Sequence, residues 1–128
     1  MRDDLGFDEA LAMLAANDGD TRILFRVVAQ GLGDALGDLA ELEYAGRFGK
    51  RAKELTSIRV TLGERTFSLS VESRGLSALI ETSSGGVRIR SERVAVDAWF
   101  TQLHDELAAR ADSSERARSA LERLALGR

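Results

Sequence analysis

Three carboxylates, Asp34, Asp38 and Glu41, recur at i, i+4 and i+7 within a stretch that has helical periodicity. This spacing places them on one face of a helix. Neighbouring carboxylates perform acid-base catalysis when burial separates their pKa values. The apolar residues of the same stretch lie on the opposite face, so we expect these carboxylates to be solvated and not catalytic.

Other residue types that support catalysis or metal binding are sparse. His104 is the only histidine, and the chain has no cysteine. Thr101, and not a carboxylate, occupies the position that a Glu-x-x-His metal motif would use before His104. The serine pairs at 83–84 and 113–114 fit a turn and a helix cap better than an activated nucleophile. The sequence therefore predicts a protein that is not an enzyme and that has no metal site and no cofactor.

Gly31, Gly33 and Gly37 form the pattern G-x-G-x-x-x-G. Dinucleotide-binding loops use G-x-G-x-x-G between a parallel strand and a helix, so a phosphate-binding loop is one interpretation. The alternative is a helix whose glycines let another backbone approach closely, although each glycine costs about 1 kcal/mol relative to alanine. The different spacing favours the helix.

Apolar and polar residues alternate in four short runs between Thr56 and Arg90, and each run ends at a turn signal. This alternation predicts strands with one buried and one solvated face. Gly63-Glu64 fits a two-residue hairpin loop, and Gly85-Gly86 belongs to another turn. Tight turns predict that neighbouring strands pair in sequence order. The apolar residues of the four runs are Ile58-Val60-Leu62, Phe67-Leu69-Val71, Leu76-Ala78-Ile80 and Val87-Ile89.

The flanking segments have helical spacing of their apolar residues. They predict a short helix over 7–16 and a second helix that Asp20 caps and that continues to about Tyr44. The fold class is therefore α+β, with N-terminal helices, a four-stranded antiparallel meander and a long C-terminal helix packed on one sheet face. We expect one domain over 1–128, in which a short N-terminal helix and turn (1–20) precede a helix-sheet-helix core (21–126).

The C-terminal helix carries an apolar stripe that keeps near-heptad steps through the sequence Asp112–Glu115. That sequence resembles a capping box, so a break into two helices is the alternative to one long helix. The end of the stripe is expected to extend past a small sheet and to need a partner, most simply a second copy of the chain. The residues of this expected interface are Ala117, Leu121 and Leu124.

Basic residues are concentrated in the middle of the chain. Residues 1–43 hold 10 acids and 3 bases, whereas residues 44–93 hold 5 acids and 10 bases. Such asymmetry indicates either an anionic partner or attraction between segments of one fold. Phosphate contacts would use charge without reading base sequence. The candidate nucleic-acid or anion-binding residues are Arg47, Lys50, Arg51 and Lys53 in a loop and Arg59, Arg88 and Arg90 on the solvated strand face.

The hydropathy and the composition of the chain indicate where in the cell the protein is expected. No window approaches the roughly 18 apolar residues that a membrane span needs, and the acidic start Met1–Asp4 does not fit a secretory signal. The absence of cysteine suits a reducing compartment. We expect a cytoplasmic protein with no membrane contact.

Helices on both sides of an antiparallel meander resemble the YbaB/EbfC nucleoid-associated proteins over residues 21–126. That resemblance implies a small dimeric bacterial DNA-binding protein, although four strands and an acidic first helix depart from the family. The stretches 87–92, 96–99 and 120–124 are similar to small uncharacterised proteins of high-GC bacteria, and this similarity implies no activity.

The sequence as a whole favours binding over chemistry. The first hypothesis is a cytoplasmic accessory protein that forms a homodimer and contacts another protein through the open sheet face or the C-terminal helix. The second is a nucleoid-associated DNA-binding protein that uses the basic loop over 47–53. A small-ligand-binding domain with a pocket between helix and sheet is the third.

Overall fold

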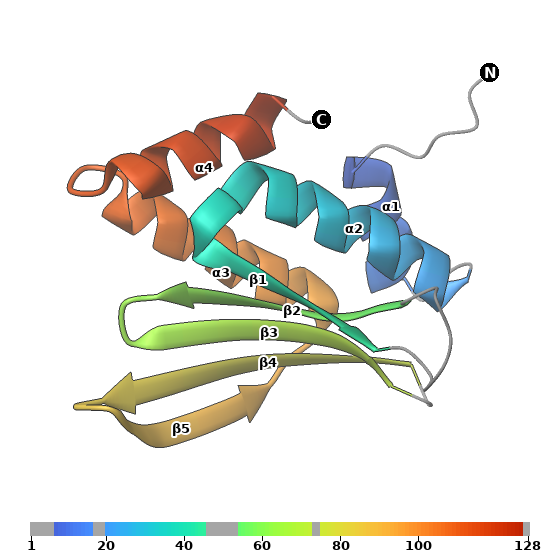
Figure 1. The fold of residues 1–128 in the computed structure, drawn as a ribbon, viewed down its shortest axis with the longest axis horizontal. Coiled ribbons are helices and arrows are strands. Elements are labelled where there is room, and N and C mark those ends of the chain that lie inside the picture. The colour runs from blue at the N-terminus through green and yellow to red at the C-terminus, as the bar shows by residue number, and fades with distance from the viewer. Residues whose placement is uncertain (1–6, 17–19, 46–53, 73–74, 127–128) are drawn as a thin grey trace.

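The computed structural model describes residues 7–16, 20–45, 54–72 and 75–126. Its fold is α+β, with the helices gathered on one face of a five-stranded antiparallel sheet (Figure 1). The strands follow one another in the order β1-β2-β3-β4-β5, so the sheet is a meander. The elements are α1 (Phe7–Ala15), α2 (Thr21–Leu36), a 3-10 turn η1 (Gly37–Leu39), β1 (Ala40–Ala45), β2 (Glu54–Leu62), β3 (Arg65–Glu72), β4 (Gly75–Ser84), β5 (Val87–Arg93), α3 (Val96–Arg110) and α4 (Glu115–Leu126).

The second helix is shorter than predicted, and a fifth strand takes its place. Asp20 caps α2 as expected, because its carboxylate accepts hydrogen bonds from the amides of Arg22 at 3.0 Å and Ile23 at 3.3 Å. The helix ends at Leu36, because Gly37 adopts φ +57 and ψ −123, a conformation that glycine reaches readily and other residues do not. The prediction of a helix to Tyr44 is therefore wrong.

Strand β1 forms the outer edge of the sheet next to β2. Its residues Ala40 and Leu42 pair with Val60 and Ile58, which are completely buried, so these two side chains lie on the core face. Glu41 alternates with them and lies on the opposite face. The apolar positions that suggested one helix are thus divided between η1, which contains Leu39, and β1, in which Ala40 and Leu42 alternate with period two.

The C-terminal segment forms two helices. The chain leaves α3 at Arg110, and the Ser114 hydroxyl accepts a hydrogen bond from the Ala117 amide at 3.1 Å, which begins α4. The capping sequence therefore breaks the helix, and the prediction of one long helix on the sheet is wrong. Helix α3 packs on the sheet, and α4 packs against α2 and α3. Figure 1 shows α4 in the layer farthest from the sheet.

The core lies between the helices and the inner face of β1–β4. Trp99 is completely buried, and its ring meets Phe67 edge-on at 6.2 Å between centroids. Its indole Nε1 donates a hydrogen bond to the Leu79 carbonyl at 3.2 Å, which ties α3 to β4. The largest completely buried side chains are Trp99, Phe25, Phe67, Leu32, Ile58, Leu69, Leu103, Leu107, Val28 and Val60.

The hairpin loops confirm the turn signals of the sequence. Leu62 pairs with Arg65, so Gly63 and Glu64 form a two-residue loop between β2 and β3. Ser84 pairs with Val87, and both glycines between them have positive φ, +59 at Gly85 and +83 at Gly86. Two residues with positive φ suit the right-handed twist of a tight hairpin.

Gly63 has a second role, because the guanidinium of Arg110 lies where its Cβ would be. Arg110 also donates a hydrogen bond from Nε to Glu106 at 3.0 Å. We expect Gly63→Ala to lower the free energy of unfolding by about 1–3 kcal/mol, because alanine is strained at φ +61 and displaces this guanidinium. Urea unfolding measures the loss.

Gly85→Ala is the matched control for that substitution. Gly85 has nearly the same φ, +59, but its Cβ would meet nothing within 4 Å. Only the conformational cost applies there, so its loss of stability is expected to be the smaller of the two. Equal losses at both glycines would contradict a role for the Arg110 contact.

None of the described helices has the length and the apolar character required to cross a membrane.

Candidate functional site

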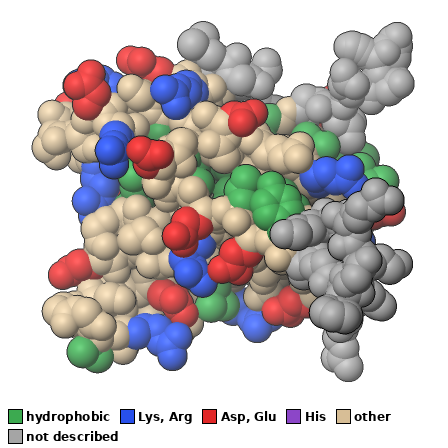
Figure 2. All heavy atoms as spheres, in the orientation of Figure 1, with side chains coloured by type: hydrophobic (Ala, Val, Ile, Leu, Met, Phe, Trp, Pro, Cys, Tyr) green, Lys and Arg blue, Asp and Glu red, His purple; other side chains and the backbone are tan. Residues whose placement is uncertain are grey.

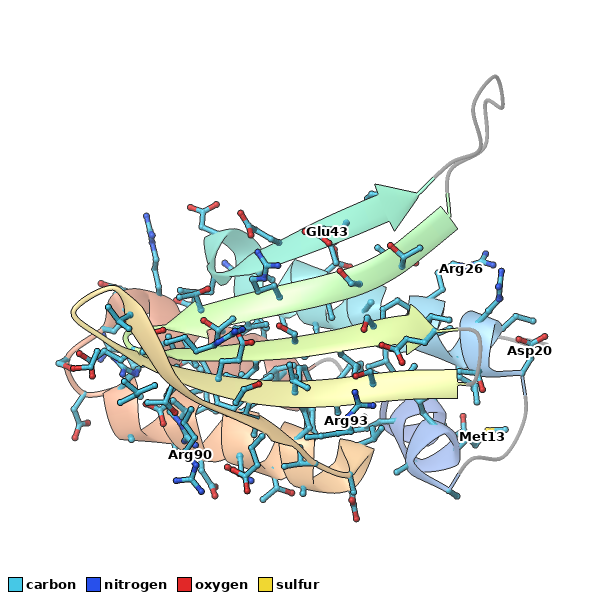
Figure 3. The ribbon with its side chains drawn as sticks, turned by 90° about the horizontal axis from the view of Figure 1, so that it is seen from below. Met13, Asp20, Arg26, Glu43, Arg90 and Arg93 are labelled. Atoms are coloured by element: carbon cyan, nitrogen blue, oxygen red, sulfur yellow. The ribbon has the colours of Figure 1, made fainter. Side chains whose placement is uncertain are left out.

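The sheet face that points away from the helices, here called the open face, is polar. Figure 3 looks onto this face, with Glu43 on β1 and Arg93 on β5 labelled. Hydroxyl side chains predominate in its centre, and a shallow depression of about 400 Å³ crosses β1, β2 and β3 there. The residues that line the depression include Glu43, Thr56, Ser57, Arg59, Ser68, Ser70 and Glu72.

Two of the predicted anion-binding arginines on the open face have carboxylate neighbours. The Arg59 guanidinium lies 3.8 Å from Glu41 and 3.9 Å from Glu43, which project from β1. Arg88 on β5 lies 3.0 Å from Glu81 on β4. Each carboxylate competes with a phosphate for its arginine. Figure 2 shows the same mixture, with charged side chains of both signs interspersed over the sheet.

Arg90 does not share a face with Arg88, contrary to the prediction. A register shift between Thr82 and Ser83 leaves one extra residue on β5, so that Arg88 pairs with Ser83 and Arg90 with Thr82. Adjacent residues of β4 point to opposite faces. Such a bulge places Arg90 on the helix side of the sheet, where it lies 3.8 Å from Glu92.

The basic loop lies outside the described residues. Arg47, Lys50, Arg51 and Lys53 all fall in the interval 46–53, between β1 and β2. Nucleic-acid binding by this loop therefore stays a prediction.

The outer edge strand β5 is the most exposed element. All 7 of its residues are exposed, and Val87 and Ile89 each show 64% of their surface to solvent. The prediction that every strand buries one face is therefore wrong for β5. An edge strand with exposed aliphatic side chains is a template for pairing with another chain. β5 pairs with β4 on one side and with no other described strand.

The hydrogen bonds of β5 show which backbone groups face outward. The Val94 amide, just after β5, donates to the Ala78 carbonyl of β4 at 3.0 Å. Residues of an antiparallel strand alternate between bonding to one neighbour and to the other. Glu92 therefore bonds to β4 like Val94, whereas the amide and carbonyl groups of Ser91 and Arg93 point to the free edge.

The predicted C-terminal interface lies mostly within the core. Ala117 and Leu124 are buried at 1% and 7% exposure, and Leu121 packs partly buried against the same core. The stripe is not free, because α4 packs against α2 and α3. The expectation that these side chains need a second copy to cover them is thus wrong, while self-association itself stays a prediction.

The residues considered for catalysis are dispersed or solvated. Asp34, Asp38 and Glu41 belong to α2, η1 and β1, so they do not share a helical face as predicted. His104 is exposed on α3. Among the described residues, no three His, Asp or Glu side chains are grouped so that they could hold a metal ion.

The glycines of α2 have packing roles. A Cβ on Gly31 would come within 2.6 Å of the Phe7 ring, and a Cβ on Gly33 within 3.2 Å of Leu42. Gly31 and Gly33 thus lie in a helix as predicted, but neighbouring side chains and not another backbone approach them, and Gly37 ends the helix.

A second depression, of about 340 Å³, lies between the end of α2 and α4. Arg116 lies 3.6 Å from Asp38 across it. Arg123 donates a hydrogen bond to the Ala35 carbonyl at 3.5 Å, near the C-terminus of α2, where a cation is favoured. These contacts join the two helices.

The chain matches no protein-family model, no curated protein and no solved structure.

Proposed function

We propose that this chain is a non-enzymatic interaction protein that binds an extended segment of another polypeptide along the outer edge of β5. The observation that supports this most strongly is the exposure of Val87 and Ile89 on an edge strand. The backbone groups on the free side of an edge strand with exposed aliphatic side chains are a template for pairing, and strand addition to a sheet edge is a common mode of peptide recognition.

The backbone and side chains of β5 supply different parts of this binding. The outward amides and carbonyls of Ser91 and Arg93 provide hydrogen bonds to any extended chain, which gives affinity without sequence preference. Ile89 adds apolar surface, and Arg88 and Glu92 add charges of both signs. Charges on an edge strand also oppose indiscriminate aggregation, so the partner must complement them.

The open face is less suited to be the principal binding surface. Its arginines lie beside carboxylates, and exposed ion pairs of this kind contribute roughly 0–1 kcal/mol each. A protein partner that pairs with β5 would continue the sheet and extend this face. Binding at the edge is thus compatible with further polar contacts on it.

Affinity capture of the tagged chain from its native lysate, with and without nuclease, tests the proposal. We expect a protein partner that survives nuclease treatment and that Ile89→Lys reduces at least about tenfold, because burying an isoleucine side chain contributes roughly 1.5–3 kcal/mol. Ile89 is already exposed, so the lysine should leave the fold intact. Circular dichroism of the variant checks this.

Ile23→Lys is the matched control. Ile23 on α2 is 51% exposed, so the same chemical change is made on a surface away from β5. Capture should be unaffected by this variant. Equal capture by both variants, or bound material that nuclease removes, would contradict the proposal, and the second result would favour the basic loop and nucleic acid.

A further inference from the structure

We infer that the polypeptide that pairs with β5 is a second copy of this chain, joined antiparallel about a two-fold axis through Ser91. This inference depends on the proposed function of the β5 edge and names its partner. The two sheets would then form one continuous sheet with β5 of each copy at its centre, and the helices of both copies would lie on the same side.

The outward backbone groups limit which registers are possible. Ser91 and Arg93 direct their amides and carbonyls to the free edge, whereas Glu92 directs its groups to β4, as the bond from Val94 to Ala78 indicates. Two copies can exchange backbone hydrogen bonds only when residues whose amides and carbonyls point to the free edge lie opposite each other. Centring the axis on Ser91 meets this condition, because Ser91 faces its own copy.

The charges of β5 select this register. With the axis at Ser91, Arg90 of each copy lies directly opposite Glu92 of the other, so two pairs of opposite charge form. Directly opposed residues that do not exchange hydrogen bonds are the closer pairs of an antiparallel ladder, with about 4.5 Å between Cα atoms. Arg90 and Glu92 already lie 3.8 Å apart within one chain, so the four side chains would alternate in sign.

The other registers that meet this hydrogen-bonding condition place like charges opposite each other. An axis at Arg90, Glu92 or Arg93 sets that residue against its own copy. An axis at Arg88 or Ile89 would centre the pairing on the register shift, where β5 is not a regular strand. Between Arg90 and Arg93, the register centred on Ser91 is the one without a like-charged pair.

The same register covers exposed aliphatic surface. Ile89, the extra residue at the register shift, adjoins the paired segment and would lie near Arg93 of the other copy, whose aliphatic stem can pack on the isoleucine side chain. The residues nearest the axis, Arg90 to Glu92, lie beyond the register shift at Thr82 and Ser83, so regular pairing with β4 supports them.

The molar mass of the purified full chain, measured by light scattering over a dilution series, tests the inference. We expect twice the chain mass of 13.9 kDa at high concentration. Arg90→Glu or Glu92→Arg alone should raise the dimer Kd at least about tenfold, because the two-fold axis converts one substitution into two like-charged pairs. The double variant Arg90→Glu with Glu92→Arg should restore dimerisation.

Glu122→Arg, on the exposed side of α4, is the control for the change in net charge that Glu92→Arg makes. It should leave the Kd unchanged. Circular dichroism should show that all variants keep the fold. A monomer at every concentration, a dimer that both single variants leave intact, or a double variant that stays monomeric would each overturn the inference.

These outcomes separate the inference from the proposed function. If the chain is monomeric but Ile89→Lys still abolishes capture of a different protein, the edge binds a polypeptide and the second copy is the wrong partner. If neither Ile89→Lys nor the charge variants change any association, both proposals fail.

Discussion

Trp99→Ala is expected to lower the free energy of unfolding by about 3–5 kcal/mol. The indole is completely buried between α3 and the sheet. Alanine would leave a cavity, remove the edge-on contact with Phe67, and leave the Leu79 carbonyl without its indole donor. Since small domains are stable by roughly 5–15 kcal/mol, such a loss removes a large part of the total.

Trp99→Phe measures how much of that stability loss comes from the missing hydrogen bond and the smaller ring. Phenylalanine keeps an aromatic ring against Phe67 but cannot donate to Leu79. We expect a smaller loss of about 1–3 kcal/mol, which combines the missing hydrogen bond with the smaller ring. Urea unfolding of both variants measures the two losses. A loss below about 1 kcal/mol for Trp99→Ala would contradict the placement of α3 on β4.

Leu124→Glu is expected to lower the free energy of unfolding by at least about 3 kcal/mol. Leu124 is 7% exposed on the face of α4 that packs against the core. Glutamate there would lose the apolar burial and would place a carboxylate in a site that offers little water. Thermal unfolding by circular dichroism measures the effect, and partial loss of helix would indicate that α4 has separated from α2.

Leu121→Glu is the matched comparison, three residues earlier on the same helix. Leu121 is only partly buried, so its carboxylate can reach solvent, and the loss is expected to be clearly smaller. If Leu124→Glu instead kept full stability and altered only the association state, the C-terminal stripe would be an interface after all, and its burial within one chain would be wrong.

The part of the fold that the sequence predicted well depends on short-range signals. Alternating runs and glycine turns specify neighbours in a hairpin, so the pairing of β2, β3 and β4 followed from local residues. The cap at Asp20 was likewise local. The α+β class and the meander order were therefore predictable, and the structure confirms both.

The error at residues 37–45 arose from an ambiguous spacing. Leu39 and Leu42 are three residues apart, which fits a helix, but Ala40 and Leu42 alternate with Glu41 and Glu43, which fits a strand. Gly37 is the residue that decides between them, because glycine can end a helix with a positive φ that other residues avoid. Treating Gly37 as the end of the helix would have predicted β1.

The surface properties depend on long-range packing and could not be read from the sequence. Nothing local to Ala117 or Leu124 indicates that α2 covers them, so their stripe resembled a free interface. The alternation of Val87 and Ile89 likewise predicts burial, whereas β5 lies exposed at the edge of the sheet. The carboxylates beside Arg59 and Arg88 come from neighbouring strands, and register alone brings them together.

Amide hydrogen exchange at Ser91 tests most directly whether the β5 edge pairs with another polypeptide. The measurement compares the dilute chain with the captured assembly. Edge pairing predicts that the Ser91 amide exchanges rapidly in the dilute chain and slowly in the assembly, while Glu92, already bonded to β4, changes little. Equally rapid exchange of Ser91 in both states would contradict the account.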